Sequence, residues 1–380
     1  MFSIIKLELK KFFKDKKNIV PVLIVLIFIS IFVSRNMDYE KERSQSVEPI
    51  MERRIEDIES TLKEISKKDP NNKKAIEYLN KQLKLEEYVT RHALQRRTSQ
   101  YLKALIDLDT FNIEMINAGY KYKYMDDINV CKAKIEQNTI LLNQGIKPID
   151  ENCSMQGFNF LRLSFNFPVI LCLLALVLFI SADAYSSEIQ YNTYKLLYTQ
   201  AIKERKILFG KLMSKIILSF IVIISILLGC TLLLGFKNGF GTLKYPTQII
   251  LGSSIEVISL GNYLFRQFIL LTCTILFICV LGVCISMFTK TISSTLSTSI
   301  IISGVAYLLC NMNFLNNFKT FLPFSYFNTF KTLTASNIVE GFCTHEEIIL
   351  NMNLGVISLL ISFTIILIFC IYTIEGRKNN

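Results

Sequence analysis

Six long apolar stretches constrain this chain more than any other feature. They cover approximately residues 19–34, 160–182, 207–236, 263–288, 295–312 and 350–374. Most reach or exceed the roughly 20 apolar residues that a helix needs to cross a bilayer. Buried helices of soluble proteins rarely run this long without a charge. The sequence therefore predicts an all-α integral membrane protein with six transmembrane helices.

The distribution of Lys and Arg predicts which way the chain faces. The N-terminal arm, the loop between the second and third stretches, Lys290 and the C-terminal end carry 14 of these residues, against 5 in the short loops opposite. Because cytoplasmic loops are enriched in Lys and Arg, both termini are expected in the cytoplasm and residues 35–158 outside the cell. The first stretch, 19–34, is expected to be a retained span, since eighteen residues precede it and Phe32 and Ser34 make a poor signal-peptidase site.

The net charge of +11 does not indicate nucleic-acid binding. Residues 35–158 contain 21 basic and 21 acidic residues, so the surplus lies in the arm and the cytoplasmic loops. Anionic lipid is the partner that matches charges in those places.

Residues 35–158 are expected to form an extracellular helical domain. A stripe of apolar residues predicts a helix ending near Lys68, followed by a long helix from about Asn72 to Ala118 and a third from Asp127 to Asn143. The first two should pack as an antiparallel pair, because a short turn joins them. The domain is either a small helical core or a binding surface for a partner, a substrate or an inhibitor.

Residues that carry out chemistry are scarce. The chain has two histidines, no CxxC spacing and neither a GxxxxGK[ST] nor a GxSxG motif, so we expect no enzyme activity, no metal and no cofactor bound by this chain. Cys131 and Cys153 fall in the outer segment and could form a disulfide there.

The ionisable residues nearest the apolar stretches are expected at span ends. They are Arg162, Asp183, Lys211, Lys215 and Arg266. Their position weighs against a proton- or sodium-coupled carrier, which needs charges within the spans. The Ser and Thr residues of the fifth span, 295–312, either allow close helix packing or line a passage between two halves of a dimer.

The loop SADAYSSEIQYNTYKLLYTQAIKERKILFGK at 181–211 resembles a known family. Its order of an Asp, a Glu-containing turn, a Leu pair, an Ile–Arg step and a Lys is similar to that of ABC transporter permeases of the type-2 exporter class. The matching residues are Asp183, Glu188, Thr193, Leu196, Leu197, Ile202, Arg205 and Lys211. Asn192 stands where this family usually has Gly, and Ala201 where it usually has Pro. LPFSYFNTF at 322–330 also resembles the family's segment before the last span.

The resemblance implies how the chain would be energised. Residues 184–203, within the cytoplasmic loop 183–206, would form a coupling helix seated in a groove of a separate ABC ATPase subunit that uses ATP and Mg. A second permease chain, identical or related, would complete the transporter. Residues 1–18 resemble the family's cytoplasmic interfacial arm. In that arm Ile4, Ile5, Leu9, Phe12 and Phe13 would face lipid, while lysines such as Lys10 and Lys11 would face headgroups.

The resemblance also suggests a cargo. A helical domain between the first two spans occurs in one branch of the family, often among exporters of peptides, antibiotics or lipids. The five-span part, 159–380, would then export a hydrophobic or amphipathic compound. Two alternatives remain open: a membrane sensor or immunity protein that binds a ligand through its outer helices, and an ion-extruding ABC pump.

Overall fold

The computed structural model describes residues 2–68, 72–120, 125–193, 203–251, 254–312, 315–339, 342–345 and 350–376. The chain forms two compact units. The first comprises Met1–Ser34, Met155–Phe240 and Leu264–Asn380, and the second comprises Arg35–Ser154 and Gly241–Tyr263. Each is described by itself below.

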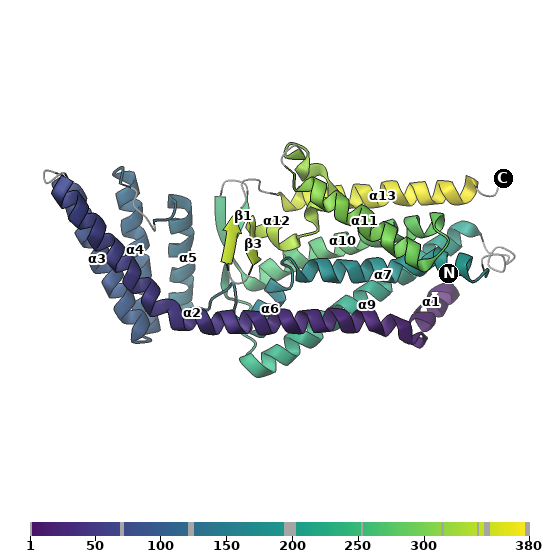
Figure 1. Cartoon of the computed structure of the whole chain (residues 1–380), viewed down its shortest axis with the longest axis horizontal. Helices are drawn as coiled ribbons and strands as arrows, with labels where there is room; N and C mark the ends of the chain where they lie inside the picture. Colours follow the sequence, from purple (N-terminus) through teal and green to yellow (C-terminus); the bar gives the residue numbers. More distant parts are fainter. Residues whose placement is uncertain are drawn as a thin grey trace. The chain divides into compact units, whose positions relative to one another are not determined.

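The first unit contains the helices that could cross a membrane (Figure 1). In chain order its elements are α1 (Phe2–Lys14), η1 (Lys16–Asn18), the start of α2 (Ile19–Lys68), α6 (Gly157–Leu163), α7 (Val169–Gln190), α9 (Glu204–Asn238), most of α10 (Leu260–Phe288), α11 (Ile292–Cys310), η3 (Lys319–Phe321), η4 (Pro323–Tyr326), α12 (Thr329–Thr334), β3 (Ser336–Val339), β4 (Phe342–His345) and α13 (Met352–Gly376). Among the described residues, six helices are long and apolar enough to span a bilayer, which confirms the predicted number.

One predicted span begins later than expected. The second apolar stretch was predicted from residue 160, but the structure divides it into the short helix α6 and the span α7, which starts at Val169. Pro168 immediately precedes α7. Proline lacks a backbone N–H and cannot continue the hydrogen bonds of a preceding helix, so the stretch breaks there.

Burial separates inner from outer spans within this unit. In their most apolar windows α7 is 72% buried and α10 is 61% buried, against 11% for the span at the start of α2, 17% for α11 and 22% for α13. Gly282 of α10 allows the closest approach, because a Cβ there would lie 2.0 Å from the Ser181 Oγ of α7. Small residues at such crossings let two membrane helices pack backbone to backbone.

The second unit is mainly helical. It holds the later part of α2 with α3 (Lys73–Leu94), α4 (Thr98–Asn117) and α5 (Ile128–Gln144), and a hairpin of β1 (Pro246–Leu251) and β2 (Ser254–Ser259). The end of α2 at Lys68 and the bounds of α5 agree closely with those predicted from the sequence. Gly145 ends α5 in the left-handed region at φ 63°, where glycine carries no steric penalty.

The prediction of one long helix from Asn72 to Ala118 is wrong, because the structure has two helices there, α3 and α4. The chain turns at residues 95–97, where Arg96 has φ 53°. The turn lets Val89 of α3 share one core cluster with Ala104 and Leu108 of α4. In one continuous helix, residues 89 and 104 would lie roughly 22 Å apart at 1.5 Å per residue, so burial of these side chains decides the break.

The β1–β2 hairpin was not predicted. Its strands pair antiparallel, with Ile249 opposite Glu256. It packs on α5, where the Gln137 side chain donates to the carbonyl of Pro246 at 2.9 Å and accepts from Gln248 at 2.8 Å. The second unit therefore includes residues 241–263, and its first segment ends at Ser154 and not at the predicted residue 158.

Candidate coupling site

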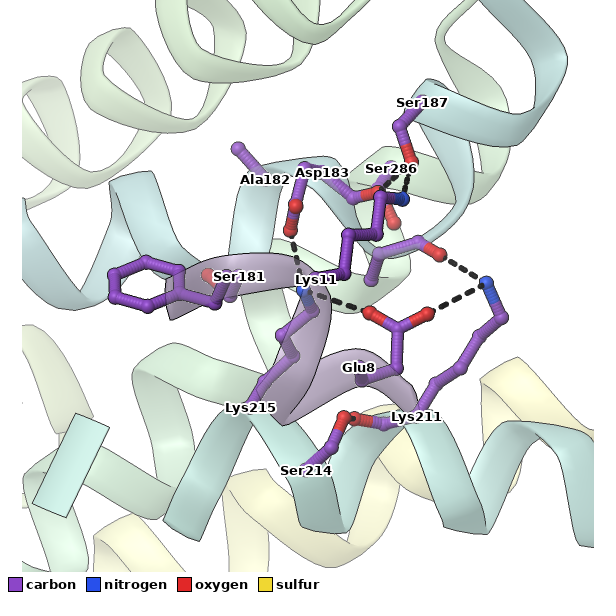
Figure 2. A network of polar contacts seen from close by, with 12 residues as sticks. Glu8, Lys11, Ser181, Ala182, Asp183, Ser187, Lys211, Ser214, Lys215 and Ser286 are labelled. Carbon is purple, nitrogen blue, oxygen red and sulfur yellow. Dashed lines mark hydrogen bonds and ion pairs between the residues drawn. The ribbon is translucent and has the colours of Figure 1, made fainter. Parts of the chain in front are cut away.

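Helix α1 buries an acidic residue, Glu8, against the other helices of the first unit. Glu8 is only 4% exposed, and its two carboxylate oxygens face α9, with Oε2 lying 3.2 Å from Lys215 Nζ and Oε1 lying 3.9 Å from Lys211 Nζ. Both lysines are 1% exposed. Because they are four residues apart in one helix, their side chains lie on the same face and meet α1 together (Figure 2).

The end of α7 supplies the other partners. Asp183 Oδ1 lies 2.5 Å from Lys215 Nζ. Lys211 donates to the carboxylate of Glu188 and, at 2.5 Å, to the backbone carbonyl of Ala184. Burying a charge costs free energy unless it is paired and hydrogen-bonded, and each of these lysines has two acidic partners.

A sixth charged residue, Lys11, links α1 to α7. Lys11 Nζ donates to Ser187 Oγ at 3.1 Å, and Ser187 in turn donates to the carbonyl of Asp183 at 2.6 Å. We call Glu8, Lys11, Asp183, Glu188, Lys211 and Lys215 the charge network. It contains three acidic and three basic side chains, so its formal charge is zero.

The electrostatics keep Glu8 ionised. Burial raises the pKa of its carboxyl, but the ammonium groups of Lys215, Lys211 and Lys11 together outweigh burial, so the pKa lies below its ordinary value. An ionised Glu8 holds the N-terminal helix onto α9 by charge-assisted bonds.

The structure brings together some of the predicted coupling residues. Asp183, Glu188 and Lys211 belong to the charge network, while Arg205 pairs with Glu375 of α13 in an exposed ion pair. Thr193 is exposed and donates its backbone N–H to the Glu188 carbonyl at 2.9 Å. The remaining predicted residues, Leu196, Leu197 and Ile202, lie outside the described residues.

The predicted start of the coupling helix needs a correction. Residues 184–190 continue α7 instead of beginning a new helix, and α7 ends at Gln190. Asn192 follows with φ 56°, in the left-handed region. Glycine adopts this region freely and asparagine tolerates it, so Asn192 serves where the family usually has Gly. A coupling helix could therefore begin only after this turn.

Of the ionisable residues expected at span ends, Lys211 and Lys215 are buried within α9, and Asp183 is partly buried within α7. Lys211 and Lys215 lie seven and eleven residues after the start of α9 at Glu204, and Asp183 lies seven residues before the end of α7 at Gln190. They are near the ends of their spans, as predicted, but they bond to one another instead of reaching the headgroups.

The N-terminal arm is helical, but its predicted apolar face is divided. Phe13 is 63% exposed and Lys10 is exposed, whereas Phe12 is 8% exposed. Ile4 packs against Gly210 of α9, where a Cβ would lie 3.2 Å from it. Ile4 and Phe12 therefore face protein, not lipid, because Glu8 between them is drawn to the lysines of α9.

Two further expectations can be compared with the structure. Thr295, Ser299 and Ser303 of α11 are buried, and Thr295 and Ser299 donate to carbonyls one turn earlier. Since α11 packs on α7, this stripe serves packing within the chain. Cys131 and Cys153 are buried free thiols, not a disulfide.

Sequence reasoning missed the roles of Glu8 and Lys215. A signal was present, because Glu8 is the only acidic residue among residues 1–14 and lies on one helical stripe with Ile4 and Phe12. An acidic residue on an apolar stripe indicates a buried basic partner.

Among the described residues, no group of three or more His, Cys, Asp or Glu could hold a metal ion.

Comparison with known proteins identifies a family. The family model described as "ABC-2 family transporter protein" matches residues 2–374. No curated protein and no solved structure matches the chain. The match covers both units and every element of the charge network.

Proposed function

Because the chain belongs to the ABC-2 family of transporter proteins, it is a multi-pass membrane permease, and we propose that a separate cytoplasmic ABC ATPase drives it. Both termini and the loop between α7 and α9 would face the cytoplasm, and residues 35–158 would lie outside the cell. A second permease chain would complete the transporter, and ATP and Mg would act in the ATPase alone.

The observation that supports coupling is the charge network. It joins α1, α7 and α9 at the two ends of the loop that follows Thr193 and precedes Glu204. A push on that loop would act on α7 and α9 through their ends, and Glu8 would carry the displacement to α1. Packed elements linked by ion pairs move as a body between two arrangements more readily than they deform.

We propose export of a hydrophobic or amphipathic compound. Every charged residue of α7 and of residues 207–236 in α9 belongs to the network, which leaves the remaining surfaces of these spans to apolar contacts. An ion-extruding pump is less well supported, since Glu8, Asp183 and Glu188 all bond to lysines and ion pathways are lined by accessible charges. A sensor that binds ligand through the outer helices is the second alternative.

Purification of the tagged full chain from its native membrane tests the ATPase partner. A stoichiometric P-loop ATPase is expected with the wild-type protein, and Leu197→Asp should release it, because a charge would enter the apolar face predicted to dock. Lys290→Asp introduces the same side chain at an exposed position outside the loop between α7 and α9 and serves as a control. Absence of an ATPase, under conditions that preserve other membrane complexes, would favour the sensor.

The role of the network is tested separately with a charge exchange. Glu188→Lys leaves the ATPase bound but uncouples ATP hydrolysis from transport, since Lys211 then faces a like charge. Adding Lys211→Glu restores opposite charges and should recover part of the coupling. Glu204→Lys, at the start of α9, controls for a charge change at the loop. Full coupling in the Glu188→Lys variant would contradict the proposal.

A further inference from the structure

A cavity lies in the first unit beside the charge network. It has a volume of about 450 Å³, within the roughly 300–1,000 Å³ of ligand pockets. Three segments line it: the end of α1 with Phe12 and Phe13, the start of α2 with Val22 and Leu26, and the middle of α9 with Ile226 and Leu233. Two of the three segments are candidate membrane spans.

The lining is almost entirely apolar. Among the described residues that line it, only Asn18 and Ser225 bring side-chain nitrogen or oxygen atoms to the wall, and the Asn18 amide already donates to the carbonyl of Phe12 at 3.0 Å. None of the lining residues in the described part of the chain is charged. An occupant would therefore gain free energy through burial of hydrocarbon and not through polar contacts within the cavity.

The turn at one end of the cavity is basic. Lys14, Lys16 and Lys17 are exposed, and this short stretch is flanked by the lining residues Phe13 and Asn18. The acidic residue of the turn, Asp15, uses its carboxylate to accept from the backbone N–H of Lys17 at 3.1 Å. The net formal charge of the turn is +2, next to a hydrocarbon-lined cavity.

We propose that this cavity holds an acyl chain of an anionic phospholipid, with the headgroup phosphate against Lys14, Lys16 and Lys17. An acyl chain matches the apolar wall, and an anionic headgroup matches the lysines. A zwitterionic lipid would match the wall but not the turn. The bound lipid would brace the end of α1 against α2 and α9, at Phe12, one helical turn beyond Glu8. This site does not depend on the identity of the ATPase or of the cargo.

The absence of tryptophan from the chain permits a site-specific test. Phe13→Trp places a single fluorophore at the cavity, and Phe288→Trp places one at the exposed end of α10 as a matched control. The full-length proteins are reconstituted in phosphatidylcholine vesicles with increasing mole fractions of brominated phosphatidylglycerol or brominated phosphatidylcholine, which quench tryptophan on contact.

We expect brominated phosphatidylglycerol to quench Phe13→Trp several-fold more than brominated phosphatidylcholine at equal mole fraction, and Phe288→Trp to show no preference. Replacing Lys14, Lys16 and Lys17 with Gln should abolish the preference. The same change at the exposed residues Lys63, Lys84 and Lys132 should not.

A second variant separates the cavity from simple surface attraction. Gly229 of α9 lines the cavity, and a Cβ there would meet nothing within 4 Å, so Gly229→Phe can fill the space without a clash at its Cβ. It should remove the preference, whereas Gly304→Phe, at an equally open position of α11, should leave it intact. Equal quenching by both lipids at Phe13→Trp would overturn the proposal. So would a preference that survives Gly229→Phe, since the lysines would then act alone, or weak quenching by both lipids, since another compound would then fill the cavity.

Discussion

At the scale of single residues, the permease buries charges by pairing them. Lys215 is 1% exposed and contacts the carboxylates of Asp183 and Glu8. Removal of one member of a buried ion pair costs about 3–5 kcal/mol, because the other charge is left without compensation. Lys215 therefore offers the clearest test of the charge network.

Lys215→Met should destabilise the permease by about 3–5 kcal/mol. Lys206→Met, an exposed position of the same helix, should change stability by less than about 0.5 kcal/mol. Thermal unfolding of the purified proteins in detergent measures both. Combining Lys215→Met with Asp183→Leu should cost less than the sum of the single changes, since the two side chains interact directly. Strict additivity would show that the pair does not contribute to stability.

In the second unit, a buried aspartate predicts that stability depends on pH. Burial raises the pKa of Asp109 to about 6, with Asp126 and Glu86 raising it further against the opposing effects of Lys134 and Arg54. The folded state therefore binds a proton that the unfolded state, with its ordinary lower pKa, has already released. The free energy of unfolding must therefore fall as the pH rises from the ordinary pKa of 3.8 to the folded-state pKa of about 6. The total fall is roughly 2–3 kcal/mol for a pKa shift of this size.

Hydrogen exchange of the α4 amides in the full chain, corrected for intrinsic rates, measures this dependence. Protection should increase as the pH falls from about 7.5 to about 4, because the gain begins near the folded pKa and ends near the unfolded pKa. Asp109→Asn should remove most of the change, because it cannot ionise, whereas Asp107→Asn, at an exposed position of the same helix, should retain it. An unchanged profile in Asp109→Asn would assign the pH dependence to other groups.

At the scale of elements, the sequence predicts lengths better than interruptions. The apolar runs and the stop at Gly145 predict the six spans and α5, because hydrocarbon thickness and glycine geometry act locally. The break at Arg96 and the division of α6 from α7 depend on what the side chains bury after folding. The charge network was only partly predictable for the same reason: Asp183, Glu188 and Lys211 stood out in one loop, but Glu8 is more than 170 residues away in the chain.

The contact between α7 and α10 gives a prediction for a pair of elements. Gly282→Ala would place a methyl group 2.0 Å from the Ser181 Oγ, so α10 must move away from α7 two residues from Asp183. We expect a loss of about 1–3 kcal/mol, as for overpacking in a core, together with weaker ATPase-coupled transport. Gly304→Ala, in open space, should raise stability by up to about 1 kcal/mol through helix propensity. Equal melting temperatures for the two variants would contradict the close packing of α7 on α10.

At the scale of the whole molecule, the order of the spans along the chain decides which side of the membrane the second unit faces. Membership of the family shows that the chain is a multi-pass permease, and the bias of Lys and Arg predicts that both termini are cytoplasmic. The second unit contains segments from two separate connections, 35–154 and 241–263. Each connection lies between an odd-numbered span and the even-numbered span that follows, so six crossings place both on the same side, opposite the termini.

Epitope tags followed by a protease site test this arrangement in intact cells. A tag inserted in the turn at residues 95–97 should be cut by protease added from outside, and a tag in the loop between β1 and β2 should be cut as well. Tags at the two ends of the chain should be cut only after the membrane is permeabilised. Changing Lys6, Lys10, Lys11 and Lys14 together to Gln should weaken the orientation bias, whereas four Lys-to-Gln changes in the second unit should not. Cleavage of a terminal tag in intact wild-type cells would show that the orientation is the reverse of the predicted one. The loop between α7 and α9 would then lie outside the cell and could not contact a cytoplasmic ATPase.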